Sequence, residues 1–279
     1  MKKIALILLL IVGFSGPGVM KAQNVLDGVY PKDHIPNRKP IPFAYVREAD
    51  VLWAKKIWRV IDLREKINLP LYYPVTPMDG RFSLVDLLMQ GIQYEGIKAY
   101  KDDEFKTEKK VEDILRDLGA STDTTRIKKA DGTYENKIIV QEVRSYEVKQ
   151  FLVKEVWFFD RKYSRLDVRI VGLCPVREYE KEDGSGSGEV LKKQVFWVYF
   201  PEIRNLLARN EVFNPKNDAQ RHSFDDIFLK RYFGSYIIKE SNVYNNRRIE
   251  DYTAGMDAYL ESERIKNEIF NIEQDMWQW

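Results

Sequence analysis

Few side chains in this 279-residue sequence have the types and spacing that catalysis or metal binding requires. The two histidines, His34 and His222, lie far apart, and neither has a second ligand at the short spacing typical of zinc sites. A metal site that used both would depend entirely on the fold. The single cysteine, Cys174, cannot form an internal disulfide, and we interpret it as a small buried apolar residue rather than a reactive thiol. The sequence therefore predicts no metal and no cofactor.

Two pairs of adjacent carboxylates could supply an acid and a base of the kind that glycosidases use. Asp102 and Asp103 lie in a charged segment. Asp226 follows a serine by three residues, the spacing of a helix capping box, which would occupy its carboxylate next to Asp225. The sequence contains no G-x-S-x-G, C-x-x-C or H-E-x-x-H motif. The alternating glycines of 180–189 lack the flanking strand and helix of a phosphate-binding loop and predict a flexible connection.

The N-terminus is typical of a secretory signal peptide. Two lysines precede an apolar run of about eleven residues, which is shorter than the ~20 that a spanning helix needs. We expect the signal to cover residues 1–22, with cleavage after Ala22. Its removal takes away three lysines and no acidic residue, so the formal net charge falls from +2 to −1, which argues against nucleic-acid binding. No cysteine follows that could carry a lipid, and export without disulfides suggests a bacterial periplasm.

The segment 23–46 contains four closely spaced prolines and predicts an extended arm that lies on its own domain or on a neighbour. The segment 48–68 predicts a helix that ends at Asn68, because its apolar residues recur at helical spacing and place Trp53 and Trp58 on a core-facing stripe. An aromatic extended piece, 71–74, follows it.

Further helices are predicted after two capping serines, Ser83 and Ser223, and over 107–118 and 202–209. A polar linker is expected over 120–135. The C-terminal helix, within 257–279, has a narrow apolar seam that would dock on its own domain or accept a partner helix. The residues of this seam are Ile265, Ile269, Ile272 and Met276.

The middle of the chain is predicted to be β. Strands are expected at about 151–159, 165–173 and 190–200, the first two joined as a hairpin. Strands followed by several helices predict an α+β fold, with an antiparallel sheet in a single domain over 47–256.

Four segments of the sequence are similar to the GldN/PorN family. They are V-L-D-G-V-Y at 25–30, H-I-P-N-R-K-P-I-P at 34–42, the stretch from Arg47 to Pro74, and the D-M-W-Q-W ending, which resembles gliding-motility members.

The resemblance implies a non-catalytic periplasmic component of the type IX secretion system of Bacteroidota, and of gliding motility in species that glide. It implies a ring assembled with an outer-membrane lipoprotein of the GldK/PorK type, coupled to a motor of the GldL/GldM (PorM) type. The lipoprotein would hold the ring at the inner face of the outer membrane, so the chain itself would not insert into the membrane.

A ring subunit needs contact surfaces, and interfaces favour Trp, Tyr and Arg. The residues expected to include both core and interface members are Tyr45, Arg47, Trp53, Trp58, Tyr72 and Tyr73, with the four residues of the C-terminal seam as further candidates. Two alternatives remain. One is a periplasmic enzyme acting on envelope polymers through Asp225, Asp226 or His222. The other is a binding module for secreted substrates that uses strand 195–200 as an open sheet edge.

Overall fold

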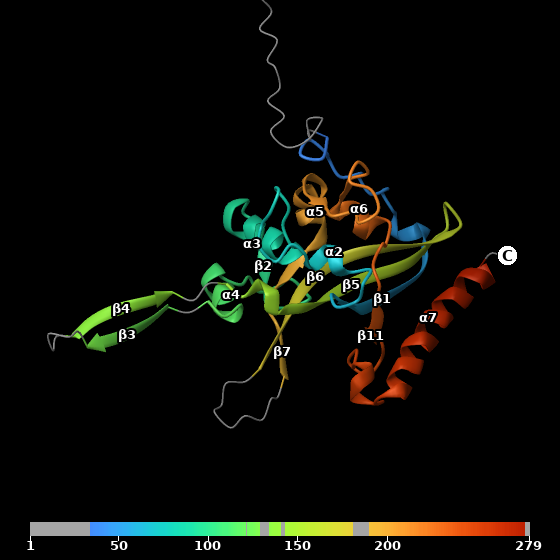
Figure 1. The fold of residues 1–279 in the computed structure, drawn as a ribbon. Coiled ribbons are helices and arrows are strands. Elements are labelled where there is room, and N and C mark those ends of the chain that lie inside the picture. Colours follow the sequence, from blue (N-terminus) through green and yellow to red (C-terminus); the bar gives the residue numbers. More distant parts are fainter. Residues whose placement is uncertain (1–33, 121, 129–133, 141–142, 181–189, 277–279) are drawn as a thin grey trace, which may run out of the picture. The chain divides into compact units, whose positions relative to one another are not determined.

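A long hairpin forms the centre of the structure, a computed structural model that describes residues 34–120, 122–128, 134–140, 143–180 and 190–276 (Figure 1). Its strands, β5 (Val148–Asp160) and β6 (Arg165–Glu180), pair antiparallel from Val148 opposite Arg177 to Asp160 opposite Arg165. Both strands are rich in β-branched and aromatic residues, which favour extended backbone. The two strands and the hairpin predicted here from the sequence are confirmed.

Five further strands complete an antiparallel sheet in the order β11-β1-β5-β6-β8-β2, with β7 also paired to β6. The predicted third strand, 190–200, is divided into β7 and β8, and Phe200 already begins a helix with Pro201 in its first turn. The bounds of the added strands are β1 (Val51–Asp62), β2 (Ala99–Tyr100), β7 (Val190–Gln194), β8 (Trp197–Tyr199) and β11 (Tyr236–Glu240). The fold is therefore α+β, as predicted.

The helix predicted over 48–68 is wrong, because Val51–Asp62 forms strand β1. Its first half alternates exposed and half-buried residues, which is the two-residue period of a strand. All residues from Ile57 to Ile61 are buried, since this half is an inner strand of the sheet and apolar side chains pack against both of its faces. A fully buried run shows no periodicity that separates a strand from a helix. A preference for strand was nevertheless present in the β-branched residues of this segment, Val51, Ile57, Val60 and Ile61.

Two other local predictions are also wrong. Residues 71–74 were expected to be extended, but α2 (Leu69–Tyr72) is a helical turn, with Pro70 in the first turn, where a missing N–H costs nothing. The expected linker 120–135 contains strand β3 (Thr122–Lys128), which pairs with β4 (Tyr134–Val140). The threonines of β3 favour strand, a signal that its polar character concealed.

The helices α3, α5 and α6 gather on one side of the sheet (Figure 1). Both capping serines behave as predicted, since each side chain accepts a hydrogen bond from the backbone N–H of the aspartate three residues later. Large buried side chains from this layer and the sheet form the main core, here called the helical core; among them are Leu87, Leu88, Phe151, Leu207 and Phe224. The helices are α3 (Leu84–Tyr94), α4 (Val111–Asp117), α5 (Phe200–Arg209) and α6 (Phe224–Leu229).

Two smaller apolar clusters complete the interior. The open-face cluster comprises Trp58, Val60, Leu152, Cys174, Val176 and Trp197. In the other, Ile265 and Ile269 of α7 (Met256–Met276) pack with Ile57, Ile237 and Ile249. The hydroxyl of Ser262 accepts a hydrogen bond from the Ile237 N–H at 3.0 Å, which fixes α7 to β11. Half of the predicted α7 seam therefore docks on its own domain.

The remaining elements are short. They are β9 (Glu211–Val212), paired with β10 (His222–Ser223), and the 3-10 turns η1 (Glu48–Asp50), η2 (Ser145–Glu147) and η3 (Ile249–Asp251). Of the predicted arm, residues 34–46 are described. Within them Ile35 is buried, Arg38 pairs with Asp226, and Phe43 lies under the guanidinium of Arg204. This part of the arm lies on its own domain.

Candidate functional site

The adjacent carboxylates Asp225 and Asp226 are both occupied by structural contacts. Asp225 accepts two hydrogen bonds from the buried guanidinium of Arg204, at 2.9 and 3.0 Å. Asp226 accepts from the Ser223 N–H at 3.1 Å and from Arg38 at 2.7 Å. Desolvation alone would raise the pKa of Asp226, but the Ser223 hydrogen bonds and the Arg38 charge outweigh it and hold this pKa below its ordinary value. The pair therefore fixes the start of α6 and the arm.

The other reactive side chains are not assembled into a site. His34 is exposed, and the ring of His222 lies edge-on to Tyr232 with 6.4 Å between centroids. Cys174 is buried, and desolvation raises the pKa of its thiol, which keeps it protonated. Within the described residues, no three His, Cys, Asp or Glu side chains come together as ligands.

Asp103 has a structural role on the opposite side of the sheet from the helices, where it holds a loop against Trp58. Its carboxylate accepts a hydrogen bond from Trp58 Nε1 at 2.9 Å, and its carbonyl accepts from Lys154 Nζ at 2.6 Å. Phe105 of the same loop sits over Gly172, where an added Cβ would lie 2.6 Å from Phe105 Cζ. Trp58 is thus a core residue of the open-face cluster.

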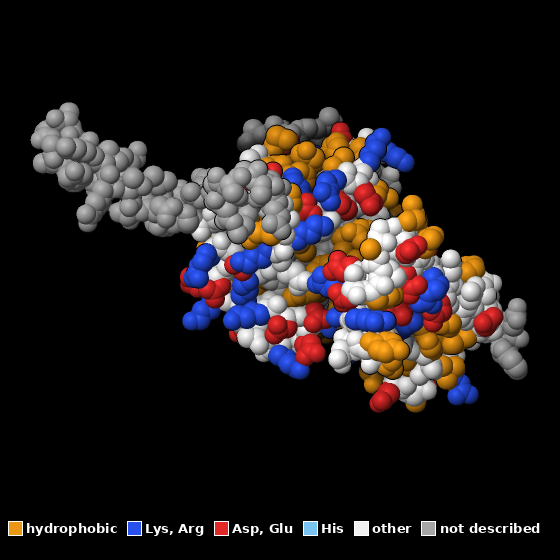
Figure 2. Space-filling model, turned by 90° about the horizontal axis from the view of Figure 1, so that it is seen from below, with side chains coloured by type: hydrophobic (Ala, Val, Ile, Leu, Met, Phe, Trp, Pro, Cys, Tyr) orange, Lys and Arg blue, Asp and Glu red, His pale blue; other side chains and the backbone are white. Residues whose placement is uncertain are grey.

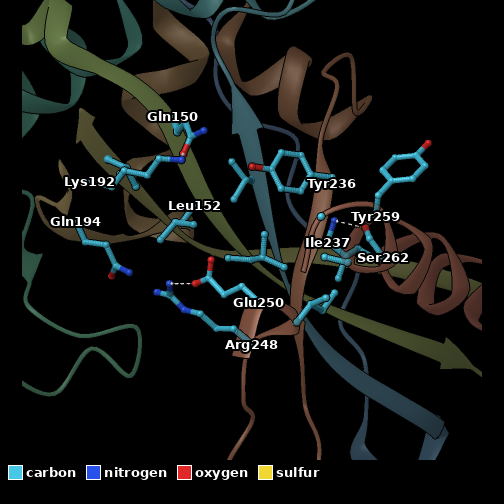
Figure 3. Close-up of a pocket in the computed structure, with 16 residues that line it drawn as sticks. Gln150, Leu152, Lys192, Gln194, Tyr236, Ile237, Arg248, Glu250, Tyr259 and Ser262 are labelled. Atoms are coloured by element: carbon cyan, nitrogen blue, oxygen red, sulfur yellow. Dashed lines mark hydrogen bonds and ion pairs between the residues drawn. The ribbon is translucent and has the colours of Figure 1, made fainter. Parts of the chain in front are cut away.

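A groove of about 490 Å³ lies beside this loop, within the size range of binding clefts (Figure 3). Val60, Leu152 and Val176 form its apolar floor on β1, β5 and β6. Its walls come from β7, β11, η3 and the first turns of α7. In Figure 3, Tyr236 reaches from β11 toward Lys192 and Gln150 on the far wall. We call this hollow the sheet groove.

The charged residues that line the sheet groove are Lys192, Arg248 and Glu250. Arg248 is neutralised by Glu250 at 2.7 Å, whereas Lys192 is only loosely placed, 3.5 Å from Glu178. An adjoining hollow of about 240 Å³ shares Leu152, Gln194, Ile238 and Arg248 with the groove. It adds the cations Lys101 and Lys239 and the acids Asp102 and Asp103. The Lys239 ammonium lies 4.3 Å from the centre of the Trp58 ring, and no acidic partner of Lys101 or Lys239 occurs among the described residues. Burial, together with the charge of Asp62, raises the pKa of Tyr236.

A second hollow of about 480 Å³ is more apolar and lies near α2. Its lining includes Leu69, Pro70, Tyr73, Pro74, Met78, Phe213 and Pro215. The view from below shows apolar side chains interleaved with both signs of charge, and no broad surface of one sign (Figure 2). This face therefore has no broad charged surface, and the described residues form separate local hollows.

The residues predicted for core and interface divide into exposed and buried members. Tyr45 is 87% exposed and Tyr73 is 53% exposed. Arg47 is exposed and donates to Asp50 at 2.7 Å. Trp53 is half-buried against the α7 cluster, and half-buried Tyr72 donates its hydroxyl to the Tyr146 carbonyl at 2.9 Å.

The strand predicted as an open edge is internal, because β8 pairs with β6 on one side and with β2 on the other. Ile272 and Met276 of the α7 seam are half-buried. The sheet groove was not predicted from the sequence, because residues of seven separate elements build it.

A family model described as gliding motility associated protein GldN matches residues 46–278, which is most of the sequence. The chain belongs to the GldN family. Membership associates it with gliding motility and type IX secretion. No curated protein matches the chain. Among the described residues, no helix is both long enough and apolar enough to cross a bilayer.

Proposed function

We propose that this GldN-family chain is a non-catalytic structural subunit of the type IX secretion system, and of the gliding machinery where one is present. The observation that carries the proposal is the family match over 46–278. The geometry supports it, because the candidate catalytic carboxylates stabilise the fold and the described surface offers apolar docking sites. A role in envelope-polymer hydrolysis would require a carboxylate that faces substrate, whereas Asp225 is bound to Arg204.

The subunit works in the periplasm, held at the inner face of the outer membrane by a lipoprotein of the GldK/PorK type. The chain and this lipoprotein form a ring that couples to a GldM/PorM-type motor subunit. The exposed residues Tyr45 and Tyr73 and the end of the α7 seam are the candidate contacts within this assembly. Three of the predicted contact residues are buried within the subunit and are no longer candidates: Trp58, Ile265 and Ile269.

Co-expression of the chain from Gln23 onward with an unlipidated GldK-type lipoprotein tests the proposal. We expect stable co-purification through an affinity tag on either protein, and arcs or rings in negative-stain micrographs. Asp102→Asn serves as the matched surface control and should leave co-purification unchanged. A monodisperse chain that ignores the lipoprotein would contradict the proposal, and hydrolysis of peptidoglycan by the purified chain that is lost in Asp226→Asn would replace it with the enzymatic alternative.

A further inference from the structure

The sheet groove combines an apolar floor with Lys192 of β7, whose ammonium lies 3.5 Å from Glu178. The adjoining hollow adds Lys239 of β11, which has no acidic partner among the described residues. Such a site suits a segment with apolar anchors and negative charge, because the anchors displace water from the floor and the charges meet the rim.

The chain itself contains a segment of this composition. Residues 273–279 read E-Q-D-M-W-Q-W, with two acidic residues, no basic residue and three large apolar side chains. Glu273 has no ion pair among the described residues, and Met276 is half-buried at the end of α7. Trp and Met are among the residues enriched at interface centres.

This segment cannot reach the groove of its own subunit. The last α7 residue that lines the groove is Ser262, fourteen positions before Met276. At about 1.5 Å per helical residue the two lie about 21 Å apart along the helix. Trp279 follows Met276 by three residues, which extend over about 10 Å at most. An occupant with this sequence must come from another copy.

We propose that residues 273–279 of one subunit dock in the sheet groove of a second copy. The indoles of Trp277 and Trp279 cover Val60, Leu152 and Val176, and the acidic side chains face Lys192 and Lys239. Because the two contacting surfaces differ, the interaction is head-to-tail, and repetition of it gives a ring when the rotation closes. The inference rests on the proposed function, because it requires that copies of the subunit lie next to one another in an assembly.

A labelled peptide tests the docking directly. The probe is fluorescein-labelled F-N-I-E-Q-D-M-W-Q-W, residues 270–279 with an amidated end. The receiver is the chain with Trp277→Ala and Trp279→Ala, so that its own segment does not compete. Fluorescence anisotropy should show saturable binding that weakens severalfold between about 0.05 and 0.5 M salt. A peptide with both tryptophans replaced by alanine should bind at least about tenfold more weakly.

Receiver variants locate the binding site. Lys192→Glu and Tyr236→Ala should each weaken binding about tenfold or more. The matched controls Lys230→Glu and Tyr94→Ala, which are also exposed, should change it less than about twofold. Circular dichroism confirms that each variant is folded. Absence of saturable binding, or equal losses in groove and control variants, would overturn the inference.

Co-purification with the lipoprotein separates this inference from the proposed function. If the peptide does not bind while the lipoprotein still co-purifies, the docking fails and the assembly role stands. If Lys192→Glu abolishes lipoprotein co-purification without changing peptide binding, the groove belongs to the lipoprotein and the docking is overturned.

Discussion

The two faces of the central sheet are sealed in different ways. The helical face is covered by α3, α5 and α6. Its buried charges include an ion pair between Asp225 and Arg204. The opposite face is covered in part by the loop that Asp103 fixes to Trp58, and the rest is the sheet groove. The comparison therefore sets a face closed by packed helices against a face that keeps an open groove.

Adjacent residues of β5 test this difference most strongly. Phe151→Ala should cost about 3–5 kcal/mol in the free energy of unfolding, because Phe151 lies in the closely packed helical core. Leu152→Ala, on the groove side, should cost about 2–3 kcal/mol, since water fills part of the space that is left. Urea denaturation measures both. A larger loss for Leu152→Ala would reverse the assignment of the two faces.

The buried pair of the helical face gives the next largest effect. Asp225→Asn should destabilise the chain by about 3 kcal/mol, because it leaves the Arg204 guanidinium buried without a counter-charge. The matched change Asp102→Asn, at an exposed aspartate, should alter stability by less than about 0.5 kcal/mol. Thermal unfolding of both variants checks this, and similar melting temperatures would mean that the pair contributes little.

The capping aspartate makes part of this stability depend on pH. Because the folded-state pKa of Asp226 lies below its ordinary value of about 3.9, its stabilisation is present above that pH and disappears as the pH falls through the folded pKa. Asp226→Asn should cost about 1–2 kcal/mol at pH 7. The difference from the wild-type chain should shrink toward pH 3. A difference that stays constant from pH 7 to pH 3 would show that the carboxylate charge is unimportant.

The groove side should respond least when only a hydrogen bond is removed. Trp58→Phe keeps an aromatic ring in the open-face cluster and loses the Nε1–H donor to Asp103, which should cost about 1 kcal/mol. Asp103→Asn retains an oxygen acceptor for the indole but removes the ion pair with Lys154 at 3.3 Å, so it measures the charge contribution separately. A loss as large as that of Phe151→Ala would mean that this loop is part of the main core.

The sequence predicted the parts of this fold that depend on local signals. The hairpin of β5 and β6 follows from its own apolar runs, and both capping serines follow from residues within one turn. Strand β1 was missed because its burial depends on β5 and β11, which are distant in the sequence.

The site was less predictable than the fold. The roles of Asp225 and Asp103 depend on Arg204 and Trp58, partners that no spacing rule connects to them. The sheet groove likewise joins residues from Val60 to Ser262. The aromatic composition favoured contact surfaces, but it did not indicate where a groove would lie.

Hydrogen–deuterium exchange of the chain alone and in the assembly that it forms with the GldK-type lipoprotein tests most directly whether a neighbouring subunit covers the open face. We predict that assembly slows amide exchange in β11 and the first turns of α7, which form walls of the sheet groove, while the amides of α3 and α5 exchange unchanged. Protection confined to α3 and α5, with β11 and α7 exchanging as in the free chain, would contradict the account.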